Sequence, residues 1–155
     1  MMKIAVSACL LGHNVRYDGS NKQNNELLKL LKNSEVIPIC PEVLGGLNIP
    51  HLPCEINGNQ VINSNKDDVT KYFKSGSLLA YEKIQGCDFV ILKTKSPSCG
   101  YRKIYDGSFS GKLIDGNGIF AQICINNKIK IYTENDIELI KAKINGDWYL
   151  HFLFK

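Results

Sequence analysis

Cysteine is the residue type in this chain whose number and placement most suggest chemistry. The 155-residue sequence contains six cysteines, at positions 9, 40, 54, 87, 99 and 124. No two of them form a CxxC pair, which argues against zinc ribbons, zinc fingers and thioredoxin-like redox sites. Disulfides are disfavoured in the cytoplasm, where we expect this protein, so this many thiols indicate a metal site or catalysis. A metal would have to take its ligands from separate parts of the chain.

Three of the cysteines come at the ends of apolar segments that we expect to be strands. Cys9 ends the run KIAVSAC, Cys40 ends EVIPIC, and Cys99 lies in the turn SPSCG just beyond CDFVILKT. In open α/β sheets the ligand crevice lies beyond the carboxyl ends of the strands. We therefore expect these three thiols to meet at one edge of a sheet.

Two other cysteines are expected to fill the core. Cys87 begins the strand segment that precedes SPSCG, and Cys124 lies between Ile123 and Ile125 in an apolar helical segment. Free cysteine commonly behaves as a small buried hydrophobic residue. The three remaining strand-end thiols are fewer than the four ligands of structural zinc. They suit an iron–sulfur cluster with one iron left open, but three independently packed cysteines are an alternative that the spacing leaves open.

The elements that must position these cysteines alternate between strands and helices. The pattern of apolar residues predicts strands at 3–9, 35–42, 87–94 and 129–133. Helices are expected at 24–33, 67–86, 119–127 and 134–144. Between them lie a predicted Gly/Pro-rich loop, a hairpin centred on Asn57-Gly58, and a glycine-rich segment that is a hairpin or irregular, at 42–55, 55–63 and 101–118. This alternation predicts an α/β fold, a small three-layer Rossmann-like domain with a mostly parallel sheet. If the three strand-end thiols hold an iron–sulfur cluster, that site lies at the carboxyl ends of the strands.

The composition is that of an ordinary globular protein. Hydrophobic residues make up 44% of the chain and charged residues 22%, and we expect one domain over residues 1–155. The longest apolar runs fall short of the ~20 residues of a membrane-spanning helix, and the first residues lack the pattern of a signal peptide. The 19 basic and 15 acidic residues give a net charge of +4 without a basic tract. We therefore expect neither a nucleic acid nor a membrane as partner.

Five sequence blocks together resemble the TudS-like thiouracil desulfidase family, in the family's order and over about residues 3–133. The blocks are VSACLLGHNVRYDG (6–19), CPEVLGGLNIP (40–50), DVTKYF (68–73), LKTKSPSCG (92–100) and IYDGSFSG (104–111). The resemblance implies an enzyme that removes sulfur from thiolated uracil. It also implies a [4Fe–4S] cluster with one open iron, held by Cys9, Cys40 and Cys99.

The resemblance further implies two catalytic residues. Glu42 in CPE corresponds to the family's acidic residue, and Ser96 in SPSCG to its serine. A carboxylate beside the cluster would take a proton from an attacking water, and Ser96 would contact the substrate or relay a proton. A solvated loop glutamate and a serine that only completes its turn are the alternatives.

Further residues in the same loops are candidates for substrate binding. They are Arg16, Ser98, Tyr105 and Asp106, with the aromatic side chains of Tyr17 and Phe109 nearby in sequence. An aromatic ring would stack on a planar base, and the charged groups would recognise its edge. Salt bridging among these residues and turn formation explain them equally well.

Two positions depart from the family pattern. Many relatives show arginine where this chain has His51, and a small residue where it has Cys54. We place both at the mouth of the pocket and expect neither to be a ligand.

The sequence thus predicts a non-redox desulfidase that acts on a small thiolated pyrimidine, such as 2- or 4-thiouracil, and gives the oxo base and hydrosulfide. Two alternatives come from other functional classes. One is a non-catalytic iron–sulfur or zinc binding module. The other is a hydrolase or transferase with Cys99 as nucleophile, for which none of the histidines at 13, 51 and 151 has a recognised partner.

Overall fold

A computed structural model describes residues 1–146. Its centre is a four-stranded sheet in the order β2-β1-β5-β8, and every neighbouring pair is parallel. The strands are β1 (Lys3–Ser7), β2 (Glu35–Ile39), β5 (Phe89–Leu92) and β8 (Ile131–Thr133). The predicted α/β fold with a mostly parallel sheet is therefore confirmed.

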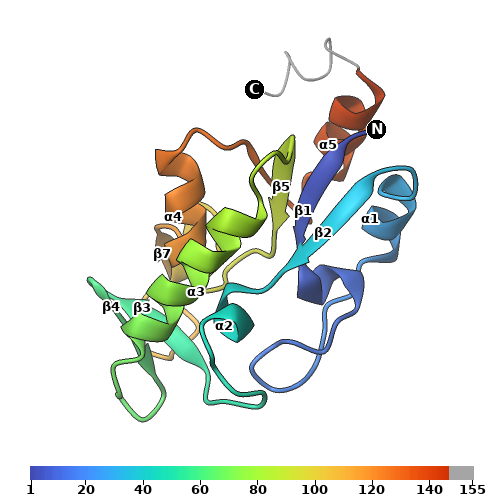
Figure 1. Ribbon diagram of the computed structural model, residues 1–155. Coiled ribbons are helices and arrows are strands. Elements are labelled where there is room, and N and C mark those ends of the chain that lie inside the picture. Colours follow the sequence, from blue (N-terminus) through green and yellow to red (C-terminus); the bar gives the residue numbers. More distant parts are fainter. Residues whose placement is uncertain (147–155) are drawn as a thin grey trace.

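Helices cover both faces of this sheet and give the molecule three layers (Figure 1). One face packs against α3 (Thr70–Lys83) and α4 (Ile119–Asn126). The other packs against α1 (Asn25–Leu30) and α5 (Ile137–Asn145). Parallel strands joined by crossover helices are buried on both sides, which explains why FVIL of β5 is apolar throughout rather than alternating.

The alternation of side chains along β1 shows how the core is divided. Ala5 belongs to the cluster under α3 and α4, whereas Ile4 and Val6 belong to the cluster under α1 and α5. In β5, Val90 likewise faces the first cluster and Ile91 the second. Successive side chains of a strand point to opposite faces, so each strand contributes to both halves of the core.

Short elements gather at the carboxyl edge of the sheet. They are the 3₁₀ helix η1 (Ala8–Leu11), the helix α2 (Pro41–Leu44) and two antiparallel hairpins, β3 (Cys54–Asn57) with β4 (Gln60–Asn63) and β6 (Lys103–Tyr105) with β7 (Leu113–Asp115). Figure 1 shows α2 and the β3–β4 hairpin below the sheet. The β3–β4 turn has the expected Asn-Gly signal, with Gly58 at a φ of 63°.

Three strands, β1, β2 and β5, end earlier than the sequence predicted, and the first two differences place a cysteine at the start of a short helix. The first strand ends at Ser7, so Cys9 lies in η1. The second ends at Ile39, and Cys40 is the N-cap of α2. Proline at the first helical position has no N–H to lose, so Pro41 begins a short helix where the predicted strand 35–42 meets the predicted loop 42–55.

Glycines allow α2 to lie directly against α3. A Cβ atom on Gly45 would stand 1.9 Å from the backbone oxygen of Tyr72, and one on Gly76 would stand 1.8 Å from that of Pro41. Neither distance is possible for a real side chain. The close contact of the two backbones therefore depends on glycine at both places, and it fixes the position of α2 and of the residues at its start.

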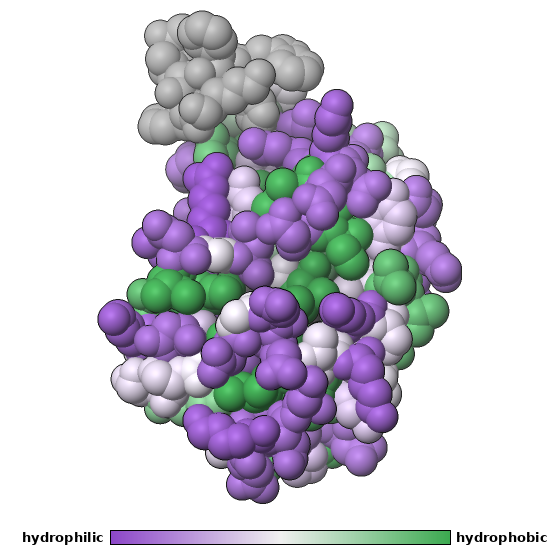
Figure 2. Space-filling view, turned by 90° about the vertical axis from the view of Figure 1, so that its left-hand side faces the viewer, coloured by the Kyte–Doolittle hydropathy of each residue, from purple (hydrophilic) through white to green (hydrophobic). Residues whose placement is uncertain are grey.

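The surface on the side of α3 and α4 is mostly hydrophilic, with apolar patches interrupted by polar side chains (Figure 2). The large apolar residues exposed on α3 are Leu78 and Leu79. Across residues 1–146, no helix has the length and apolar character needed to cross a membrane.

Candidate active site

A cavity of about 710 Å³ lies at the carboxyl edge of the central sheet. Its lining includes Cys9 from η1, Cys40 from the start of α2 and Cys99 from the turn after β5. The three thiols that sequence reasoning selected thus line one cavity. They come from three separate segments because three neighbouring parallel strands, β2, β1 and β5, end at this edge.

The turn that carries Cys99 is held together by its own side chains. The Ser96 hydroxyl oxygen accepts hydrogen bonds from the backbone N–H groups of Ser98 and Cys99, at 3.1 and 2.9 Å. The Gly100 N–H donates to the Ser96 carbonyl at 2.8 Å. A Cβ on Gly100 would lie 2.5 Å from that same oxygen. The small residues of SPSCG are therefore needed for a turn tight enough to bring the Cys99 thiol into the cavity.

Burial dominates the electrostatics of the three thiols. It raises the pKa of Cys9, although the cationic side chains of Lys93 and Arg16 oppose this. It raises the pKa of Cys40 to about 11. At Cys99 burial is again the largest cause of a raised pKa, and repulsion from Cys40 and Cys9 adds to it. Bare thiolates are therefore costly here, and a cationic metal group would offset their charge.

The donor set fits an iron–sulfur cluster better than one metal ion. In the described part of the chain, no three His, Cys, Asp or Glu side chains stand close enough together to hold a single ion. In a cubane each thiolate binds a different iron, so the thiols stand around a larger volume than the ligands of one ion. Cys9 and Cys99 are buried, Cys40 is partly buried, and all three line one cavity, as such a cluster requires.

Glu42 is the carboxylate in this cavity that makes side-chain contacts with two other segments. The Ser98 hydroxyl donates to its Oε2 at 2.7 Å, and His51 Nε2 lies 3.4 Å from its Oε1. The Ser96 and Ser98 hydroxyl oxygens are 2.9 Å apart. Because the single Ser98 proton points to Glu42, Ser96 donates to Ser98. The two serines and the glutamate therefore form one hydrogen-bonded chain.

The predicted substrate-binding residues divide into two groups. Arg16, Ser98 and Tyr105 line the cavity. The carboxylate of Asp106 instead accepts hydrogen bonds from the backbone N–H of Ser108 at 2.9 Å and from its hydroxyl at 2.5 Å. Hydrogen bonds from Ser108 also lower the pKa of Asp106. The turn-forming alternative therefore describes Asp106, which is absent from the cavity lining.

The sequence did not predict the ion pair and hydrogen bonds that hold Lys93 at the same edge. Lys93 lines the cavity, and its Nζ lies 3.0 Å from Glu134 Oε2. Thr94 donates to the Glu134 carboxylate through its backbone N–H at 2.9 Å and its hydroxyl at 2.8 Å. The Lys93 N–H donates to Ser7 Oγ at 3.0 Å. The sequence feature that could have indicated this network is that Lys93 and Thr94 directly follow β5 and Glu134 directly follows β8.

A second missed residue, Glu55, joins the two hairpins. Its Oε1 accepts hydrogen bonds from the N–H groups of Gly107 and Phe109, at 3.0 and 3.1 Å. Phe109 lines the cavity and has a φ of 57°. The carboxylate therefore holds the β6–β7 loop in a conformation that places an aromatic ring at the cavity.

The other cysteines and histidines lie in different surroundings. Cys54 and His51 both line the cavity, and the Cys54 thiol donates to Leu52 O at 3.3 Å. Cys124 is completely buried in the core, and Cys87 is partly buried against the same cluster. His13 is exposed, and the third histidine of the sequence, at position 151, lies outside the described residues.

The fold and the cavity define a class: an α/β domain that presents cysteines from three strand ends to one pocket. A model of the 2-thiouracil desulfurase family matches residues 4–136, and the chain belongs to this family. It is 36% identical over 146 residues to the uncharacterized protein YbbK of Bacillus subtilis (strain 168), covering 86% of this chain and 97% of that protein.

A solved structure agrees with this assignment. The protein it contains is described as the [4Fe-4S]-dependent thiouracil desulfidase TudS, and it superposes with a TM-score of 0.87 at 38% sequence identity. The match covers 94% of this chain and 99% of that one.

Proposed function

We propose that this protein is a [4Fe–4S]-dependent desulfidase that converts thiolated pyrimidines such as 2- or 4-thiouracil to the oxo base and hydrosulfide. The observation that carries the proposal is that one cavity is lined by Cys9, Cys40, Cys99 and Glu42. Membership of the 2-thiouracil desulfurase family supports the same reaction. The alternative of a non-catalytic binding module is not favoured by either finding.

In this proposal Cys9, Cys40 and Cys99 hold the cluster, and the fourth iron is open. An open iron supplies a Lewis acid with affinity for a soft thiocarbonyl sulfur. The reaction replaces one C=S bond by C=O with the atoms of one water molecule, and sulfur leaves as hydrosulfide. No oxidant or reductant is consumed, because carbon and sulfur keep their oxidation states.

Glu42 accepts the proton of the attacking water. Its carboxylate is suited to this because ionised carboxylates accept protons and hydrogen bonds. The Ser98 hydroxyl, 2.7 Å from Oε2, orients that carboxylate, and Ser96 in turn orients Ser98. Both serines therefore position Glu42, and Ser98 contacts it directly.

The substrate lies against the loops that close the cavity. Arg16 and Lys93 place positive charge there, and Tyr105 and Phe109 place aromatic rings there. Rings of this kind stack on planar bases, and cationic side chains donate hydrogen bonds to the oxygen or sulfur atoms on the edge of a pyrimidine.

The test is hydrosulfide release by protein reconstituted anaerobically with iron and sulfide. We expect 2- or 4-thiouracil to give equal amounts of uracil and hydrosulfide, and Cys99→Ser protein treated in the same way to give neither. Wild-type protein that holds its full cluster and releases no hydrosulfide from any thiolated base would contradict the proposal.

A further inference from the structure

His51 is fixed in the cavity through both its backbone and its ring. Its N–H donates to Tyr17 O at 2.8 Å, and the two rings lie 6.3 Å apart between centroids. The ring atom Nδ1 is 2.7 Å from Leu52 O. Only 12% of the side chain is exposed. The imidazole is therefore held in place from several sides, unlike a histidine on a surface loop.

The contacts of the ring determine where its protons lie. A carbonyl oxygen only accepts hydrogen bonds, so Nδ1 must carry a proton toward Leu52 O. The other nitrogen, Nε2, faces Glu42 Oε1 at 3.4 Å. Two bare acceptors would repel each other, so one proton lies between His51 and Glu42. Hydrogen bonds to Cys54 and to Glu42 raise the pKa of His51 to about 10.

The Glu42 carboxylate is thereby held by both of its oxygen atoms. His51 faces Oε1, and Ser98 donates to Oε2. The two partners come from different segments, the loop after α2 and the turn after β5. A glutamate side chain has several rotatable bonds, and ordering it costs conformational entropy. With one partner alone, the carboxylate would be free to rotate about the remaining contact.

We propose that His51 is a positioning residue for Glu42, which keeps the carboxylate in the one orientation suited to accept a proton from water. The role in turnover rests on the proposed desulfidase function. The contact between the His51 and Glu42 side chains, and the orientation that it imposes, do not depend on that function.

The kinetic test compares three variants, reconstituted like the wild-type protein. A misplacement of about 1 Å can cost about 100-fold in rate, so we expect His51→Ala to lower kcat by about 10- to 100-fold while KM changes by less than about threefold. His51→Gln keeps an N–H donor and should recover most of kcat. His13→Ala, on an exposed histidine outside the cavity, should match the wild-type protein.

Two kinetic outcomes would overturn the proposal. One is a normal kcat in His51→Ala. The other is an equal loss in His51→Ala and His51→Gln, because the glutamine keeps the donor that orientation requires. Iron content, measured for every variant, separates these effects from loss of the cluster.

A structural measurement tests the positioning role without activity. In crystals of reconstituted His51→Ala we expect Glu42 to leave the Ser98 hydrogen bond or to occupy several rotamers. A Glu42 unchanged from the wild-type orientation would refute the positioning role. If wild-type protein releases no hydrosulfide, the desulfidase function fails, and this comparison still decides the role of His51.

Discussion

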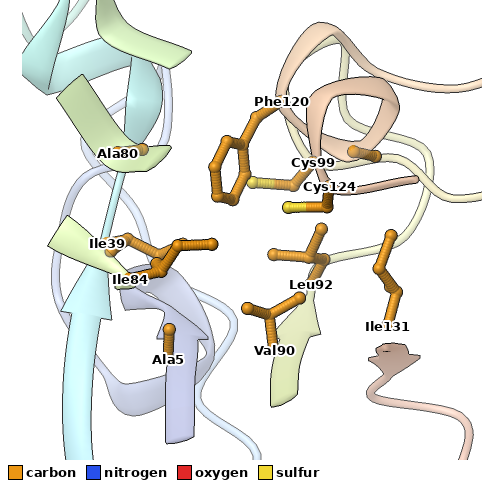
Figure 3. Packing of buried hydrophobic residues seen from close by; sticks show 11 residues of the cluster. Ala5, Ile39, Ala80, Ile84, Val90, Leu92, Cys99, Phe120, Cys124 and Ile131 are labelled. Carbon is orange, nitrogen blue, oxygen red and sulfur yellow. The ribbon is translucent and has the colours of Figure 1, made fainter. Parts of the chain in front are cut away.

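The carboxyl edge of the sheet and the packed interior beside α4 both contain buried cysteines, but they surround them differently. Cys99 and Cys124 lie in one hydrophobic cluster with Phe120 (Figure 3), and they are 4% and 0% exposed. Burial is the only cause that raises the pKa of Cys124, to about 12. At Cys99, hydrogen bonds from Ser7 and Ser98 act against burial, and other thiols are near enough to interact. Polar partners, rather than burial, distinguish the two positions.

The difference arises from how each region is built. The interior is a set of apolar side chains between the central sheet and the helices α3 and α4, so a cysteine there has only packing partners. The edge is made of turns, and turns leave backbone and side-chain polar groups that need partners of their own. Ser96, which bonds the N–H groups of its own turn, shows how these groups also fix the site.

The largest expected effect comes from changing the cysteines at the edge. Cys9→Ser, Cys40→Ser and Cys99→Ser should each reduce iron from about four per chain to near zero after anaerobic reconstitution, because a [4Fe–4S] cluster needs its thiolate ligands. Iron and acid-labile sulfide are measured by chemical assay. Cys124→Ser is the matched control and should keep its iron. If any of the three variants at the sheet edge kept its full iron content, that cysteine would not be a ligand of the cluster.

Glu42→Gln should keep the cluster and lose turnover. Glutamine has nearly the same shape as glutamate but cannot take a proton from water, and positioned acid–base groups contribute ~10²–10⁴-fold to rates. Hydrosulfide release with iron content checked is the measurement. The control is Glu26→Gln on the exposed surface of α1, and full activity in Glu42→Gln would remove this residue from the reaction.

Cys124→Ser should cost stability rather than function. A hydroxyl buried among apolar side chains without a hydrogen-bond partner costs about 1–3 kcal/mol. Chemical denaturation under anaerobic conditions should show this loss, with a smaller one for the partly exposed Cys87→Ser. Unchanged stability in Cys124→Ser would mean that the interior position tolerates a polar group as the edge does.

Ser96→Ala should have the smallest effect of the series. It removes the acceptor of two backbone N–H groups in the turn, and the loss of a comparable cap costs about 1 kcal/mol. The activity loss should be well below that of Glu42→Gln, because Ser96 reaches the carboxylate only through Ser98. A Ser96→Ala rate as low as that of Glu42→Gln would give Ser96 a direct role in catalysis.

The sequence predicted those features that depend on local patterns. Apolar runs located the four parallel strands, and Asn57-Gly58 located a hairpin. The helix α2 was missed because two glycines, Gly45 and Gly46, follow it directly and normally argue against a helix, whereas Gly45 is needed for a tertiary contact with α3. A contact of this kind leaves no periodic pattern of apolar residues in the sequence.

The same limit applies to the site. Cysteines at strand ends were found because strands can be recognised, and parallel strands share an edge. The pairing of His51 with Glu42, and the link from Glu55 to the β6–β7 loop, depend on loop paths that only the folded chain determines. Asp106 shows the converse, since an aspartate in a candidate site loop completes its own turn.

The position of iron tests whether the edge cysteines hold an iron–sulfur cluster. Crystals of anaerobically reconstituted protein, measured by anomalous scattering at the iron absorption edge, will show where iron binds. We expect one cubane in the cavity, bonded to the sulfur atoms of Cys9, Cys40 and Cys99 and to no fourth cysteine. Iron bound elsewhere, or a single ion in the cavity, would contradict it.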